Sequence, residues 1–204
     1  MPEKKVRSLW WVAIVHLIVL ALAALLVLQQ PAGGALYVGL RLAALVGLGL
    51  IFASCWSSLF VRELTKALGR PFVRAHHVLS IAGLVLATLH PLAVAIQRAS
   101  AAALLPRFSS WNGFLLRLGP IVWLLLMTGL VSALLRNKWK GWRWLHWANY
   151  LAFFAAVYHA TRLGSDVQGT GVRVVLVLMA VSLVVAFVWK RLRLRRKPAR
   201  KSAA

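Results

Sequence analysis

The sequence predicts an all-α integral membrane bundle of six transmembrane helices, with both termini in the cytoplasm. Three observations predict this class: long apolar runs, very few acidic residues, and basic residues at the ends of the runs. Of the 204 residues, 61% are hydrophobic and 14% are charged, whereas a soluble domain carries about 25% charged residues. An apolar run of about 18 residues or more can cross the hydrocarbon core of a membrane as a helix.

Six apolar runs are long enough to be such helices. They cover residues 10–28, 36–61, 72–97, 113–135, 144–161 and 172–189. Residues 1–9 form a basic N-terminus and residues 190–204 a basic tail, so residues 10–189 are predicted to form one transmembrane domain. No convincing cleavage site follows the first run, which is therefore interpreted as a retained helix rather than a signal peptide.

The basic residues predict the orientation of the helices. The chain has 25 Lys and Arg against 3 Asp and Glu, a formal net charge of +22. Most of the basic residues lie in the N-terminus, in the connections at 62–74 and 136–143, and in the tail. Because Lys and Arg favour the cytoplasmic side, we expect these segments to be cytoplasmic and to contact anionic membrane lipid. This distribution argues against nucleic acid as the partner, and a prokaryotic plasma membrane is the expected location.

The acidic residues and the cysteine exclude several classes of function. Glu3 and Glu63 lie at the predicted cytoplasmic edge, and Asp166 lies in an outer connection. Proton pumps and cation-coupled transporters usually place a carboxylate in mid-membrane, so the sequence argues against both. Cys55 is the only cysteine, which excludes an intramolecular disulfide and a Cys-x-x-Cys-His attachment site for covalent haem.

Four histidines are paired by depth on the third and fifth predicted helices. His76 and His146 lie near the cytoplasmic ends, whereas His90 and His159 lie near the outer ends. The separations within the two helices are about 21 Å and about 19.5 Å along the axis. Neutral imidazoles ligate haem iron from both sides in low-spin electron-transfer centres. The pattern therefore predicts two stacked bis-histidine haems b, with a single haem as the alternative.

Two questions about the haem ligands stay open: which histidines ligate the iron, and whether the two histidines of each helix lie on the same face. His77 is an alternative to His76, although the spacing to His90 places His76 on the same helical face. The spacing of His146 and His159 departs from a common face by roughly a hundred degrees, which requires a local irregularity or differently rotated haem planes. His16, alone on the first predicted helix, is interpreted as an interhelical hydrogen-bond partner.

Basic residues at both levels are candidate partners for haem propionates, which seek charged groups near the membrane surface. Arg74 and Arg143 are available at the cytoplasmic level, and Arg41 and Arg117 at the outer level. Snorkelling of these side chains to lipid headgroups is the alternative. The predicted cofactor site consists of His76, His90, His146, His159, Arg74, Arg143, Arg41 and Arg117.

One motif in each histidine-bearing helix resembles the ferric-reductase-like transmembrane domain: Arg74-x-His76-His77-x-Leu79-x(10)-His90 and Trp142-x-x-Leu145-His146-x(12)-His159. The resemblance covers residues 36–190. The superfamily includes ferric reductases, NADPH oxidases and the haem-binding subunit of the periplasmic methionine sulfoxide reductase system. It implies six helices in which His76 with His146 holds a cytoplasmic-side haem and His90 with His159 holds an outer haem.

The sequence departs from the family's pattern in two ways. Ferric reductases and oxidases continue after the sixth helix into a flavin- and nicotinamide-binding domain, whereas here the sixth run is followed by the basic tail. The methionine sulfoxide reductase haem subunit has a histidine in its first helix, and His16 is the corresponding residue here. That subunit typically lacks a histidine at the position of His76. We therefore expect a separate electron donor, a quinol or a flavoprotein, and an extracytoplasmic acceptor or reductase subunit. Flavin as a cofactor of this chain is left open.

The expected function is that of a b-type cytochrome, the electron-transfer membrane subunit of an oxidoreductase. No catalytic residue is predicted, because the redox chemistry would be that of the cofactor. The alternative is a haem-free membrane scaffold or transporter whose histidines are structural or bind a metal.

Overall fold

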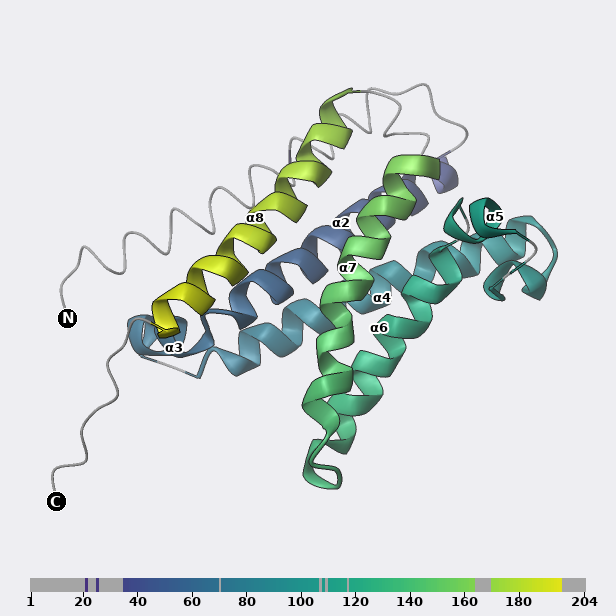
Figure 1. Ribbon diagram of the computed structural model, residues 1–204. Helices are drawn as coiled ribbons and strands as arrows, with labels where there is room; N and C mark the ends of the chain where they lie inside the picture. Colours follow the sequence, from purple (N-terminus) through teal and green to yellow (C-terminus); the bar gives the residue numbers. More distant parts are fainter. Residues whose placement is uncertain are drawn as a thin grey trace, which may run out of the picture.

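The computed structural model describes residues 35–69, 71–106, 108, 110–116, 118–163 and 170–195, together with the isolated positions Ala21 and Leu25. The described residues form helices joined by turns, bends and short irregular connections, without a strand among them, which confirms the all-α class (Figure 1). Of the predicted first helix at residues 10–28, the structure describes only Ala21 and Leu25, and His16 lies outside the described residues.

The described helices follow the predicted order along the chain. Two short 3₁₀ segments, Ala101–Leu104 and Leu135–Asn137, accompany them. The α-helices are α2 (Ala35–Ser58), α3 (Val61–Leu68), α4 (Val73–Gln97), α5 (Trp111–Leu116), α6 (Gly119–Leu134), α7 (Trp142–Leu163) and α8 (Thr170–Arg195).

The structure differs from the predicted boundaries where polar residues enter an apolar run. The run at 36–61 ends as a helix at Ser58, and the short α3 follows as a separate element. In α3 the side chain of Leu64 is buried, whereas Arg62, Glu63 and Lys66 are exposed. An amphipathic helix of this kind suits a membrane surface rather than its interior. The run at 113–135 is likewise divided into α5 and α6.

Four segments of the described helices are long and apolar enough to cross a membrane: Tyr37–Ser58, Val73–Gln97, Gly119–Asn137 and Gly171–Leu194. The helix α7 has 22 residues, but its histidines, arginines and tyrosines lower its mean hydropathy. On α4 the exposed face is a row of large apolar side chains, namely Val78, Ile81, Val85, Leu89, Leu92 and Ile96. A contiguous exposed face of this size fits contact with lipid. The described residues thus fit a membrane protein, while six helices and cytoplasmic termini stay predictions.

Two antiparallel helix pairs position the histidines: α2 packs against α4, and α6 packs against α7 (Figure 1). In the first pair, Gly47 lies directly against Gly83, where an added Cβ would meet backbone atoms at 2.9 to 3.1 Å. Small residues of this kind allow membrane helices to approach closely. The core between the pairs and α8 contains the fully buried Phe153, Leu176 and Leu183.

Candidate functional site

The imidazole rings of His76 on α4 and His146 on α7 face each other. Their centroids are 6.2 Å apart and their planes are inclined at 71°. Both rings are half-buried, whereas the neighbouring His77 is exposed. The structure therefore brings together two of the four predicted ligands, and it favours His76 over His77 as the residue opposite His146.

The ring of His76 is held by a serine from another helix. The Oγ atom of Ser54 on α2 lies 2.9 Å from Nδ1 of His76. The same hydroxyl lies 2.6 Å from the Oγ atom of Ser80, one turn further along α4. Ser54 is only 5% exposed, so this hydrogen-bond chain lies in a region that excludes most water.

The ring of His146 is held by the backbone of α6. Its Nδ1 atom lies 3.2 Å from the carbonyl oxygen of Gly129, and the amide nitrogen of Asn149 lies 3.5 Å from the same ring atom. A carbonyl oxygen only accepts hydrogen bonds, so in the shorter contact Nδ1 of His146 carries the proton, and in that tautomer it does not accept a hydrogen bond from the amide nitrogen of Asn149. Because Gly129 has no side chain, the amide of Asn149 can occupy the space where a Cβ atom would lie.

These contacts test whether the residues fit a bis-histidine haem. Metal-ligating histidines usually engage their second ring nitrogen in a hydrogen bond, which fixes the tautomer and the ring orientation. Nδ1 is engaged in both His76 and His146, which leaves Nε2 of each ring for a ligand. With metal–imidazole bonds of about 2 Å, two rings sharing one iron have centroids on the order of 6 Å apart. The observed separation and the hydrogen bonds both fit.

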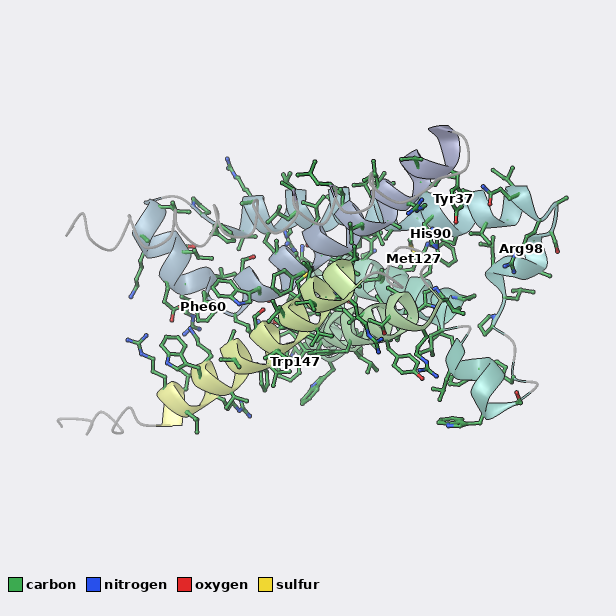
Figure 2. All side chains as sticks on the ribbon, turned by 90° about the horizontal axis from the view of Figure 1, so that it is seen from above. Tyr37, Phe60, His90, Arg98, Met127 and Trp147 are labelled. Atoms are coloured by element: carbon green, nitrogen blue, oxygen red, sulfur yellow. The ribbon has the colours of Figure 1, made fainter. Side chains whose placement is uncertain are left out.

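The helix registers place the outer histidines at one level. Ser54 lies beside His76 and Gly47 beside Gly83, so the antiparallel register continues to Arg41 at the level of Leu89 and His90. Figure 2 shows Tyr37 of α2 and His90 towards the same end of the molecule, with Phe60 towards the other. On α6 the indole nitrogen of Trp123 donates to Thr88 at 3.2 Å, which sets His90 near the first turns of α6.

His159 lies at those same turns of α6. A Cβ atom on Gly119 would lie 3.1 Å from Nε2 of the His159 ring and 3.2 Å from its Cε1 atom. The glycine therefore provides the space that the ring of His159 occupies. His90 is half-buried on α4. The structure shows a ring contact between His76 and His146, whereas the pairing of His90 with His159 stays a prediction.

The predicted arginines have different surroundings. Arg41 is 8% exposed, and its guanidinium lies 5.4 Å from the centre of the Tyr37 ring. Arg74 and Arg143 are exposed in the first turns of α4 and α7, and the guanidinium of Arg143 lies 5.4 Å from the Trp142 ring. Arg117 lies outside the described residues. A snorkelling arginine extends its charged group to the headgroups, whereas the side chain of Arg41 is buried at the level of His90.

Sequence reasoning missed the residues that orient the two facing rings. Ser54, Gly129 and Asn149 contact His76 or His146 but belong to no motif. One signal was present: Ser54 opens a group of hydroxyl and thiol residues that continues with Cys55, Ser57 and Ser58 inside an otherwise apolar run. Polar side chains inside a membrane helix usually hydrogen-bond to another helix or to their own backbone.

The part of the chain that the structure describes holds no group of three or more His, Cys, Asp or Glu side chains placed to bind a metal ion. A bis-histidine haem takes only two ligands from the protein. Comparison of the chain with protein-family models, curated proteins and solved structures finds no match.

Proposed function

We propose that the protein is a b-type cytochrome that passes electrons across the membrane through bis-histidine haem. The observation that carries the proposal is the facing pair of His76 and His146, each with Nδ1 already hydrogen-bonded. Each ring bonds through Nδ1 to a different helix, His76 to Ser54 of α2 and His146 to Gly129 of α6, so Nε2 of each ring is the nitrogen left for a ligand.

The chain's own residues would bind and orient the cofactor. His76 and His146 would hold a cytoplasmic-side haem, and His90 and His159 an outer one. Haem supplies one-electron redox chemistry when bound. The apolar helices would exclude water from it, and Arg41 at the level of His90 would offer a positive charge to an outer propionate.

Electron flow is proposed from a cytoplasmic donor, a quinol or a flavoprotein, to an extracytoplasmic acceptor or a partner reductase. The location proposed is a prokaryotic plasma membrane, with the termini and the basic connections in the cytoplasm. This orientation is supported by the excess of Lys and Arg at the ends of α2, α6 and α8 that the positive-inside rule associates with the cytoplasm.

A reduced-minus-oxidised absorption spectrum of the purified protein, after expression with excess haem precursor, tests the proposal. A low-spin b-haem signal with two haems per chain would support both histidine pairs, and one haem per chain would mean that one of the two pairs is structural. Absence of the signal from folded protein would leave the histidines as structural or metal-binding residues and refute the proposal. Vesicles loaded with ferricyanide and reduced from outside would then test transfer across the bilayer.

A further inference from the structure

The hydroxyl of Ser54 on α2 bonds to side chains of α4, and among the described hydroxyls it is the one that contacts the ring of His76. Hydroxyl groups inside membrane helices commonly donate to a carbonyl of their own helix, three or four residues earlier. Ser57, Ser58, Ser132 and Ser182 donate to the carbonyl three residues before them, and Thr88 and Thr128 to the carbonyl four residues before. Ser54 instead bonds across to α4, where it meets His76 and Ser80.

The hydrogen bonds of Ser54 have one consistent direction if His76 is a ligand. A ligating Nε2 must be unprotonated, so Nδ1 carries the ring proton and donates it to the Ser54 oxygen. The hydroxyl hydrogen of Ser54 is then available to Ser80 at 2.6 Å. The chain therefore runs from His76 through Ser54 to Ser80, and each hydrogen bond in it strengthens the next.

We propose that Ser54 is a positioning residue for His76: its hydroxyl accepts the Nδ1 proton, turns Nε2 towards the haem iron and lowers the reduction potential of the cytoplasmic-side haem. The inference rests on the proposed function. A ligand that donates a hydrogen bond through its second nitrogen becomes more basic. A more basic ligand stabilises the oxidised iron, so the potential falls.

Ser54 is also the point at which this potential can be adjusted by substitution. The opposite ligand, His146, donates to the backbone carbonyl of Gly129, which no side-chain replacement removes. Ser57 lies one turn away on the same helix, is equally buried, and bonds only within its own helix at 3.2 Å. It provides a matched control, because its replacement removes a buried hydroxyl without touching a histidine.

The experiment is a spectroelectrochemical titration of the purified, haem-loaded protein and four variants. In Ser54→Ala the ratio of reduced to oxidised haem at a fixed ambient potential should rise roughly tenfold for one haem, which for a one-electron couple is a shift of about 59 mV upward. The other haem should keep its potential. Ser57→Ala should have the wild-type potentials at both haems. Ser54→Thr keeps the hydroxyl, so it should also have the wild-type potentials. Ser80→Ala should raise the potential of the same haem as Ser54→Ala, but by less.

The possible outcomes separate this inference from the proposed function. A wild-type protein without haem refutes both. A haem-loaded Ser54→Ala protein with both potentials unchanged refutes only the role of Ser54, as does an equal shift in Ser57→Ala. If Ser54→Ala does not accumulate, the variants Ser54→Thr and Ser80→Ala test the proposal in its place. The proposal would be contradicted if the haem potential were unchanged in Ser80→Ala and higher than the wild-type value in Ser54→Thr.

Discussion

Gly47 on α2 and Gly83 on α4 lie so close that a Cβ atom on either would come within 3.1 Å of the carbonyl oxygen of the other. The contact is between two backbones, so neither side can yield by rotating a side chain. It lies two helical turns from the bond between Ser54 and His76, on the same pair of helices. The register set at this contact therefore fixes which residue of α2 faces the histidine.

Replacement of Gly47 with alanine should destabilise the protein. The new methyl group would lie 2.9 Å from the backbone nitrogen of Ala87, and overpacking of this kind costs about 1–3 kcal/mol. Gly39→Ala is the control, because a Cβ atom there has nothing within 4 Å. Thermal unfolding in mild detergent should show a lower midpoint for Gly47→Ala alone. Equal midpoints for the two variants would contradict the close approach of α2 and α4.

Replacement of His76 and of its neighbour His77 should have different effects on haem content. His76→Ala removes the ring beside His146, so the proposed cytoplasmic-side haem should be lost and the proposed outer haem retained. His77 is exposed, so His77→Ala should keep the wild-type haem content. Pyridine haemochrome assays on equal amounts of folded protein measure both. Loss of haem in His77→Ala with retention in His76→Ala would reverse the assignment.

The ion pair between Glu63 on α3 and Lys190 on α8 predicts a loss of stability in acid. Burial raises the pKa of Glu63, but the hydrogen bond from Lys190, a backbone hydrogen bond and the charges of Lys190 and Arg193 outweigh burial, so the pKa is lowered from its ordinary value of 4.5. A carboxylate with a lowered folded pKa contributes stability above its unfolded pKa, and that contribution is lost as the pH falls through the folded value.

Glu63→Gln should therefore lower the free energy of unfolding at pH 7 by less than about 1 kcal/mol, because the pair is partly exposed. As the pH falls below 4.5 and through the lowered folded pKa of Glu63, the variant and the wild type should converge. The chain has only three acidic side chains, so few other carboxylates titrate in this window, and Glu3→Gln serves as the control. A difference between Glu63→Gln and the wild type that persisted unchanged to pH 3 would show that the carboxylate charge is not the cause.

The membrane class and the order of the helices could be predicted from the sequence, because hydropathy and charge act locally along the chain. The boundaries failed where one run contained two elements. The turn after Ser58 precedes the charged helix α3. The break before Gly119 comes just before Pro120, which lacks a backbone N–H and is favoured in the first turn of a helix. A window that counts only apolar residues does not register either signal. The amphipathic pattern of α3, with Leu64 buried between charged residues, was a local signal for the first of these.

The candidate site was predicted only in part, for a different physical reason. Matching by depth was enough to select His76 and His146, because the rise of a helix is constant. The orientation of each ring depends on Ser54 and on the carbonyl of Gly129, which come from other helices. No spacing within one helix encodes such a contact. Helix register across α2 and α4 or across α6 and α7 has to be known first.

Two glycines of α6 should affect the two haem levels separately. In Gly119→Ala the new Cβ atom would lie 3.1 Å from Nε2 of His159, so the ring must move at the outer level. In Gly129→Ala it would overlap the amide of Asn149, which lies beside His146 at the cytoplasmic level. Each substitution should therefore change the low-spin signal of one haem and leave the other.

Electron paramagnetic resonance of the oxidised protein can resolve the two low-spin centres, with Gly39→Ala as the control for a glycine replacement that meets no neighbour. Combining each glycine variant with His76→Ala shows which centre it affects. The centre that Gly129→Ala perturbs should be the one that His76→Ala removes. The centre that Gly119→Ala perturbs should still be present when His76 is replaced. If both glycine variants altered the same centre, His159 would not be a ligand of a separate outer haem, and the two-level arrangement would have to be abandoned for a single haem between His76 and His146.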